Sequence, residues 1–166
     1  MSLTVEEILG PGGLIAASLS GYERRDEQLE MALAVASAFS DRRHLLAEAG
    51  TGVGKSFAYL VPAVLQAVEH KKRIIISTYT IALQEQIIGK DLPFLEKTLP
   101  VKFSAVLGKG RSNYLCFRRL EMALKGRSKL FSAAAQDQLS MLAEWAMQTK
   151  TGSLQDIGFD LEAGMW

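Results

Sequence analysis

The stretch AEAGTGVGKS at residues 47–56 restricts what this chain can fold into more than any other part of the sequence. Its alternate glycines allow tight turns and leave room for a polyphosphate beside the main chain. Backbone N–H groups in such a loop, and the start of the helix that follows, attract phosphate oxygens. The Lys55 ammonium suits the outer phosphates, and the Ser56 hydroxyl suits Mg²⁺. We therefore predict a nucleoside triphosphate site in which Lys55 and Ser56 carry the chemistry. The predicted loop residues are Ala49, Gly50, Thr51, Gly52, Val53, Gly54, Lys55 and Ser56.

The residues on both sides of the loop provide the setting that it needs. Residues 44–49 are mostly apolar, as expected of a strand buried on both faces. Residues 55–68 carry apolar side chains at helical spacing and predict a helix. The usual pattern for such a loop begins with Gly, whereas the first position here is Ala49. An ordinary glycine-rich turn between a strand and a helix is the alternative interpretation.

Strands and helices are predicted to alternate through the first part of the chain. Apolar runs predict further strands at residues 73–78 and 101–107. Helices are predicted at residues 26–39 and 80–88, and a short one is expected to open at Asp91. This alternation indicates right-handed crossovers and a parallel sheet flanked by helices. We therefore predict an α/β fold of the P-loop NTPase type.

The character of the chain changes after Gly108. Residues 109–129 hold seven Lys or Arg and one acid, although the net charge of the whole chain is only +1. A helix is predicted at residues 132–147, and no clear period follows it. The apolar stripe predicted for this helix is Leu139, Leu142, Ala143, Ala146 and Met147. We expect residues 1–108 to form one unit and residues 109–166 to form the beginning of another.

Composition excludes several classes of protein. No apolar run approaches the roughly 20 residues that a membrane helix needs. The N-terminus is acidic and lacks the apolar core of a signal peptide. A single Cys excludes an internal disulfide and fits a reducing compartment. We therefore expect a cytoplasmic protein, monomeric and without a membrane partner.

Polar residues near the loop are candidates for two further contacts. The amide of Gln28 carries donor and acceptor groups that could read the edge of an adenine. Thr78, Thr80 and Gln84 lie at and beyond the carboxyl end of the second predicted strand, the edge where open α/β sheets bind ligands, and suit the phosphates of a nucleic-acid strand. Solvated helix starts and ordinary helix capping are the alternatives.

Four stretches in order, RxxQ at residues 25–28, AEAGTGVGKS, ISTYTIALQEQ and GKGRSNYLCFRRL, resemble the DinG branch of the XPD-like superfamily 2 DNA helicases. The resemblance runs from about residue 22 to residue 120, and a loop that begins with Ala is normal in that superfamily. It implies a RecA-like sheet forming part of the first helicase lobe, with ATP and Mg²⁺ as cofactors. It also implies translocation 5′ to 3′ on DNA, coupled to ATP hydrolysis, and a role in DNA repair.

The resemblance also assigns roles to particular residues. It implies that Arg25 and Gln28 sense adenine. It implies that residues 78–86 touch single-stranded DNA, and the basic residues Lys109 and Arg111 are expected on the path of the same strand. By the same resemblance, Cys116 would be one of four thiolates that hold a 4Fe–4S cluster in a longer protein. The chain has one Cys, so no cluster is expected in this chain alone, and an inert buried thiol is the alternative.

Two elements of a working helicase are absent from the sequence. No apolar strand is followed by the Asp-Glu pair that would hold Mg²⁺ and position the attacking water. No second lobe is present to supply an arginine finger. We therefore expect an N-terminal, ATP-binding fragment of a helicase that lacks turnover by itself. A small P-loop kinase and a non-catalytic module that binds nucleotide or nucleic acid remain open.

Overall fold

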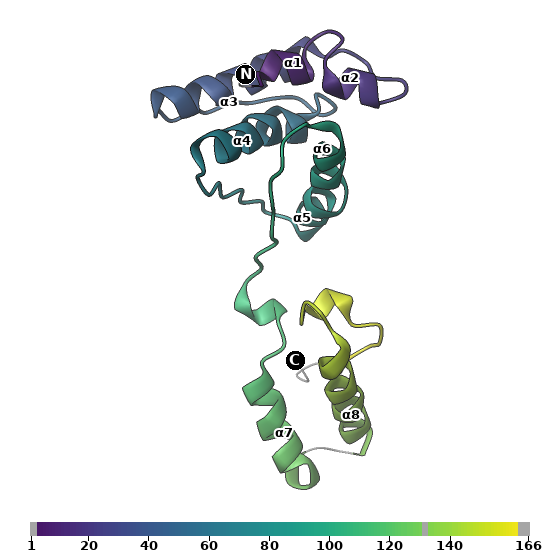
Figure 1. Cartoon of the computed structure of the whole chain (residues 1–166). Coiled ribbons are helices and arrows are strands. Elements are labelled where there is room, and N and C mark those ends of the chain that lie inside the picture. The colour runs from purple at the N-terminus through teal and green to yellow at the C-terminus, as the bar shows by residue number, and fades with distance from the viewer. Residues whose placement is uncertain (1–2, 131–132, 163–166) are drawn as a thin grey trace. The chain divides into compact units, whose positions relative to one another are not determined.

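The computed structural model describes residues 3–130 and 133–162 and divides the chain into two compact units. The first unit is Met1–Leu107, and the second is Gly108–Trp166. The helices of the first unit (Figure 1) are α1 (Val5–Leu9), α2 (Leu14–Ser18), α3 (Asp26–Asp41), α4 (Lys55–His70), α5 (Ile81–Gln86), the π-helix η1 (Ile87–Asp91) and α6 (Leu92–Thr98).

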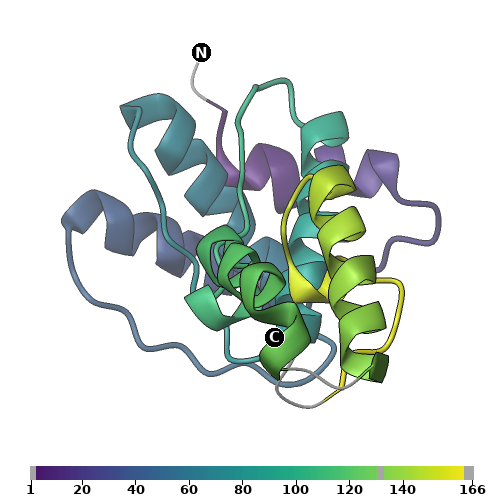
Figure 2. The ribbon, with the colours of Figure 1, turned by 90° about the horizontal axis from the view of Figure 1, so that it is seen from below.

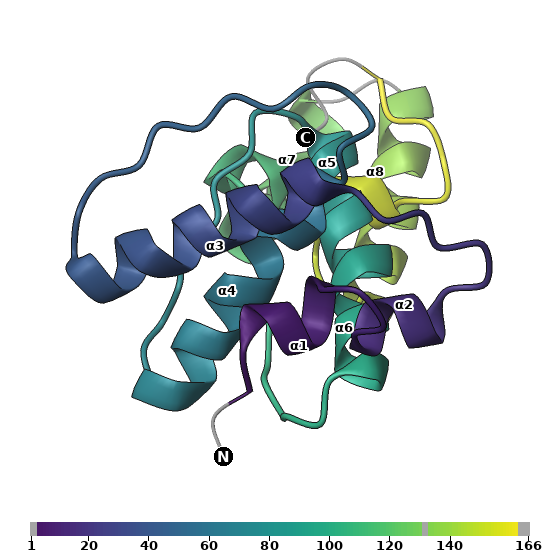
Figure 3. The same cartoon turned by 90° about the horizontal axis from the view of Figure 1, so that it is seen from above.

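Helices α3 and α4 lie side by side and hold the phosphate loop between them in the chain (Figure 3). Both were predicted from helical spacing and are confirmed, each ending two residues later than expected. Each stops at a non-glycine residue in the left-handed conformation, Arg42 with φ 53° and Lys71 with φ 51°. Helix α4 continues through Pro62, which is buried.

The segment after α4 differs from the predicted helix at residues 80–88. Instead of ending near Gly89, the helix widens into η1, where the Leu92 N–H donates to the Ile87 carbonyl, and then continues as α6. Pro93 lies in the first turn of α6 and has no N–H to donate back to the preceding turn. The π-helical turn of η1 therefore lies directly before the position at which this backbone N–H is missing.

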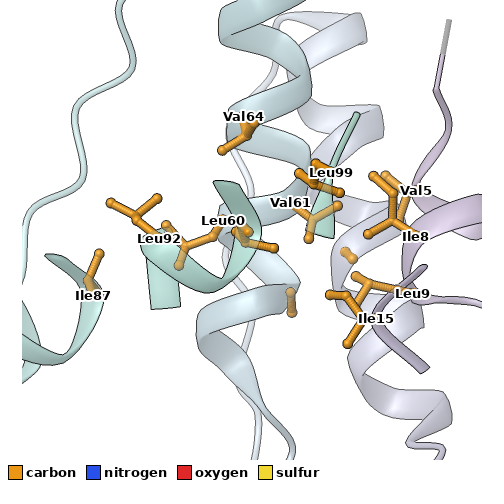
Figure 4. Close-up of a cluster of buried hydrophobic side chains, with 13 residues drawn as sticks. Val5, Ile8, Leu9, Ile15, Leu60, Val61, Val64, Ile87, Leu92 and Leu99 are labelled. Atoms are coloured by element: carbon orange, nitrogen blue, oxygen red, sulfur yellow. The ribbon is translucent and has the colours of Figure 1, made fainter. Parts of the chain in front are cut away.

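The core of the first unit is built on α4. Leu60 and Val61 are fully buried, and Figure 4 shows them between the side chains of α1 and those of η1 and α6. Helix α1 is fixed at its start by a capping box, in which Thr4 and Glu7 each bond to the other's backbone N–H. The labelled members of this core are Val5, Ile8, Leu9, Ile15, Leu60, Val61, Val64, Ile87, Leu92 and Leu99.

The three predicted strands are not strands in the described part of the chain. Residues 44–49, 73–78 and 101–107 are connecting segments without a strand ladder, drawn as plain tubes in Figure 2. Each segment has an apolar side chain that faces solvent: Leu46 is 100% exposed, Ile75 91% and Val106 93%. Val101 and Phe103, in contrast, are partly buried against the core of the first unit. A strand buried on both faces needs neighbouring strands for its backbone groups, and these three segments do not pair with one another.

The second unit has its own core between two helices. Its elements are the 3₁₀ turn η2 (Arg111–Asn113), α7 (Phe117–Leu130), α8 (Ala133–Gln148) and the 3₁₀ turn η3 (Leu154–Asp156). The predicted apolar stripe of α8 is confirmed at Leu139, Leu142 and Ala146, which pack with Leu120 of α7. Met147 was assigned to that stripe wrongly and is 85% exposed, because one residue further turns the side chain by about 100°. None of the helices in the described residues is both long and apolar enough to cross a bilayer.

Candidate nucleotide and nucleic-acid site

The phosphate loop ends where α4 begins. Gly52 has φ +84° and Gly54 has φ +81°, and side-chain-bearing residues rarely adopt this left-handed conformation. Gly54 is the N-cap of α4, so the first N–H groups of a 16-residue helix are directed to the loop without a side-chain cap. Such N–H groups, together with the helix dipole, attract an anion.

Lys55 folds back over its own loop. Its Nζ donates to the carbonyl oxygens of Ala49 at 3.0 Å and of Gly50 at 2.7 Å. The ammonium remains exposed to solvent, so an arriving phosphate can replace these two neutral acceptors with charged ones. Lys55 is thus held at the mouth of the loop by contacts that a phosphate can replace.

Gln28 and Arg25, predicted from sequence to lie near the nucleotide, reach the loop. The side chain of Gln28 is buried, and its Nε2 donates to the Gly54 carbonyl at 2.8 Å. A Cβ built on Gly54 would lie 2.0 Å from that nitrogen and 3.5 Å from Nη1 of Arg25. Only glycine leaves space at this position for the Gln28 amide. The described contact of Gln28 is with the loop, and its contact with adenine stays a prediction.

The phenol of Tyr59, which the sequence analysis did not single out, forms a hydrogen bond with Ser56. Burial raises the pKa of the Tyr59 phenol, a side-chain hydrogen bond with Ser56 lowers it, and the charge of Asp91 raises it further. Asp91 is 4% exposed and accepts a hydrogen bond from Nε2 of Gln86 at 3.1 Å. Sequence reasoning treated Asp91 only as a helix start, because nothing local shows that it faces α4.

The residues predicted to touch a nucleic-acid strand gather at the start of α5. The Thr80 hydroxyl oxygen accepts from the Leu83 N–H at 3.3 Å and caps the helix, while the Thr78 hydroxyl donates to the Thr80 carbonyl. Gln84 is half-buried on α5. Capping, the alternative role of Thr80, is therefore observed, and the strand contact stays a prediction. Tyr79 between the threonines is fully exposed.

Lys109 and Arg111, the basic residues predicted to lie on the path of a nucleic-acid strand, have different surroundings. The Lys109 ammonium donates to the Ser153 hydroxyl at 2.9 Å and to the Gln155 side chain, which joins the start of this unit to η3. Arg111, in η2, is exposed to solvent. Lys109 therefore has a structural role within its unit, whereas Arg111 presents its charge to solvent.

Cys116 is exposed and directly precedes α7. Its thiol pKa is lowered chiefly by the Arg119 backbone N–H, with smaller contributions from the Arg118 N–H and the charges of both arginines. No three His, Cys, Asp or Glu side chains gather into a metal site among the described residues. One thiolate is a quarter of the ligands that a 4Fe–4S cluster needs, so the cluster does not fit the residues of this chain alone.

A family comparison covers both units. The model of the DEAD/DEAH box helicases matches residues 28–159, from Gln28 beside the phosphate loop to the segment after η3. The chain belongs to the DEAD/DEAH box helicase family. Membership implies a P-loop NTPase fold and removes the small P-loop kinase from consideration.

Individual members of the DEAD/DEAH box helicase family agree with the resemblance seen in the motifs. The chain is similar to the "3'-5' exonuclease DinG" of Bacillus subtilis (strain 168), with 40% identity over 139 residues, or 84% of this chain. It is also 40% identical over 144 residues, 87% of this chain, to the "ATP-dependent DNA helicase YoaA" of Escherichia coli (strain K12). With the "ATP-dependent helicase DinG" of Mycobacterium tuberculosis (strain ATCC 25618 / H37Rv), identity is 38% over 173 residues and covers 95% of this chain.

The DinG-type resemblance is thereby confirmed. The chain spans only 15%, 22% and 26% of the lengths of these three relatives, in the same order. These relatives are named as an exonuclease and as helicases, so the shared segment is common to proteins named for different activities.

Proposed function

We propose that this chain is the ATP-binding part of a superfamily 2 DNA helicase of the DinG type. The observation that carries the proposal is the convergence of Lys55 and Gln28 on a glycine-rich loop at the N-terminus of α4. In a member of the DEAD/DEAH box helicase family, that arrangement suits ATP with Mg²⁺.

The proposed roles follow the chemistry of each group. The backbone of residues 49–54 surrounds the phosphates, Lys55 contacts the outer phosphates, and the Ser56 hydroxyl ligates Mg²⁺. Arg25 and Gln28 contact the adenine side of the nucleotide. The Gln28 amide has a second N–H and a carbonyl oxygen left after its bond to Gly54, which leaves it able to read a base.

The sheet is part of the proposal. Residues 44–49, 73–78 and 101–107 would become parallel strands of a RecA-like lobe when further strands lie beside them. Their exposed apolar side chains support this, because Leu46, Ile75 and Val106 need a covering layer. The phosphate loop would then follow the carboxyl end of a strand, the edge at which such sheets bind ligands.

Single-stranded DNA is the proposed macromolecular partner. Thr78, Thr80 and Gln84 at the start of α5 suit phosphate contacts, and Arg111 offers an exposed cation. A 5′ to 3′ direction, a role in repair and a cytoplasmic setting belong to the same proposal, as does one cluster thiolate from Cys116 in a longer protein. The chain alone is proposed to bind ATP without turnover, since it lacks the acid pair.

Replacing Lys55 tests the proposal. Lys55→Ala should weaken ATP binding by about 2–3 kcal/mol, because a charge-assisted contact to phosphate is lost. Lys97→Ala on α6, which replaces another exposed lysine, should bind ATP as the wild type does. Calorimetric titration with Mg·ATP measures both. Equal affinity of wild type and Lys55→Ala would remove the phosphate-loop assignment.

A further inference from the structure

Lys109 joins the start of the second unit to η3. Its Nζ donates to the Ser153 hydroxyl oxygen at 2.9 Å and to the side-chain oxygen of Gln155. The Ser153 hydroxyl donates to that same oxygen of Gln155 at 3.3 Å. Ser153 is 3% exposed, so the contact is built into the unit. We call these three residues the closing cluster, because they connect positions that are 44 and 46 residues apart in the chain.

The closing cluster holds a positive charge without an acid. In the described part of the chain, no carboxylate forms an ion pair with Lys109. Both acceptors of its ammonium are neutral oxygens, and the lysine is only half-buried. A phosphate oxygen is charged and is therefore a stronger acceptor for an ammonium than a hydroxyl or an amide oxygen. A phosphate that reaches Lys109 would compete with Ser153 and Gln155 for its N–H groups.

A backbone contact beside the cluster separates what such competition would release from what it would leave in place. The Leu115 N–H donates to the Gly152 carbonyl at 2.8 Å, and this bond does not involve the side chain of Lys109. Helix η3 follows, and its described side-chain contact with the start of the unit is that of Gln155 with Lys109. Loss of the Lys109 contact would therefore loosen η3 while the Leu115 bond remains.

Arg111 provides a way for a strand to approach the cluster. It lies two positions after Lys109, in η2, and is exposed to solvent. Exposed cations attract the phosphates of a nucleic acid over a distance of about 10 Å at 0.1 M salt. Because phosphates follow one another along a strand, a strand held at Arg111 brings a further phosphate toward Lys109.

We propose that the closing cluster is an autoinhibitory contact, in which Ser153 and Gln155 occupy Lys109 until a phosphate of a DNA strand replaces them and releases η3. The structure described here is then the strand-free form of the second unit. This inference rests on the proposed function, in which single-stranded DNA is the partner. It adds that the unit opposes the strand with its own side chains.

Gln155→Ala tests the competition, because it removes one competing acceptor and leaves the net charge unchanged. The affinity for a dye-labelled oligo(dT) strand is measured at low salt by fluorescence anisotropy. Gln155→Ala should bind the strand about threefold to tenfold more tightly than the wild type, as expected when one hydrogen bond no longer competes. Gln148→Ala, the same change at the exposed last residue of α8, should bind as the wild type does.

Lys109→Ala identifies the group for which the acceptors compete. This variant should bind the strand more weakly than the wild type, because one phosphate contact is lost. Adding Gln155→Ala to Lys109→Ala should give no gain in affinity. A gain that persists without the lysine would show that Gln155 opposes the strand in another way, and the inference would fail.

Hydrogen exchange of the wild type gives a second measurement that needs no variant. The amides of Asp156 and Ile157 donate to the carbonyls of Ser153 and Leu154 in η3. Saturating oligo(dT) should make these two amides exchange faster, while the Leu115 amide keeps its protection. Equal or slower exchange in η3 on strand binding would overturn the inference.

The remaining outcomes separate this inference from the proposed function. A purely structural cluster predicts a lower melting temperature for Gln155→Ala with unchanged or weaker strand binding, and that result would overturn the inference while the proposed function stands. Binding of oligo(dT) by neither the wild type nor Gln155→Ala contradicts the inference together with the proposed strand partner. Titration with Mg·ATP then shows whether the nucleotide part of the proposed function holds by itself.

Discussion

Gln28 holds the phosphate loop by its last glycine. Its amide nitrogen lies 2.8 Å from the Gly54 carbonyl, and that carbonyl also accepts from the Ala58 N–H at 3.3 Å as the first bond of α4. One buried side chain therefore fixes the point where loop becomes helix. The loop conformation depends on this contact even when no base is present.

We predict that Gln28→Ala weakens the binding of inorganic triphosphate as well as that of ATP. The loss for triphosphate should be about 1 kcal/mol, the usual contribution of one hydrogen bond, because the loop is no longer held. A larger loss for ATP would report the additional contact with adenine. Competition titrations with both ligands separate the two roles. Wild-type affinity for triphosphate combined with weaker ATP binding would show that Gln28 acts on the base alone.

The thiol of Cys116 should be more reactive than an ordinary exposed thiol. The pKa of the Cys116 thiol is lowered by the backbone N–H groups of Arg119 and Arg118 and by the positive charges of the two arginine side chains. Below the ordinary pKa of a cysteine thiol, a larger fraction of Cys116 is therefore present as thiolate than of free cysteine. We expect iodoacetamide to alkylate Cys116 with a pH midpoint below that of glutathione. Arg118→Gln with Arg119→Gln should raise the midpoint only part of the way, since the backbone donors remain. Coincident profiles for protein and glutathione would contradict this prediction.

At the residue scale, sequence reasoning located groups that lie close together along the chain. The phosphate loop from Ala49 to Ser56 could be predicted from sequence because its chemistry depends on the spacing of residues within one turn and the start of one helix. Gln28 was predicted as a candidate residue of the nucleotide site, but its hydrogen bond to the Gly54 carbonyl was not predicted. The burial of Asp91 was missed because it results from the packing of η1 on α4, which nothing local in the sequence indicates.

At the scale of elements, the start of α5 depends on its cap. Its six residues are the exposed first turns of the helical run that continues through η1 and α6, and the Thr80 side chain satisfies one of the first backbone donors. Thr80→Ala should cost about 1 kcal/mol of local stability, with faster hydrogen exchange of the α5 amides. Ser77→Ala, which removes an exposed hydroxyl before the helix, is the matched control. Unchanged exchange rates in α5 of Thr80→Ala would show that the cap is unimportant.

Helices and strands were not equally predictable. The helical period of α3 and α4 is a property of each segment, and both helices were found with correct starts. The apolar runs at residues 44–49 and 73–78 carried an equally clear pattern, but a strand exists only with a partner beside it. The apolar runs therefore predicted strands that would need neighbouring strands, and the part of the chain that the structure describes contains no such neighbours.

At the scale of the whole molecule, two separate cores predict two separately stable units. Leu142 is 2% exposed in the core between α7 and α8, which shares no residue with the core around α4. Leu142→Ala should destabilise the second unit by about 2–4 kcal/mol and leave ATP affinity unchanged. Met147→Ala, at an 85% exposed position of α8, should change stability by less than about 0.5 kcal/mol.

Denaturation followed by tyrosine and tryptophan fluorescence, together with ATP titration, checks this prediction. Both Trp residues of the chain lie in the second unit, so their signal reports mainly on it. A loss of ATP affinity in Leu142→Ala equal to its loss of stability would instead show that the two units fold as one.

The uncovered segments have a consequence for how such a protein is made. A ribosome adds residues in order, so any protein that carries this stretch passes through a stage at which Leu46, Ile75 and Val106 have been synthesised and lie open to water. Extended backbone with exposed aliphatic side chains is what holdase chaperones bind and what neighbouring nascent chains can pair with. Under the proposed sheet, the delay until covering strands are made would be a period of risk, and slower translation just after this stretch would lengthen it.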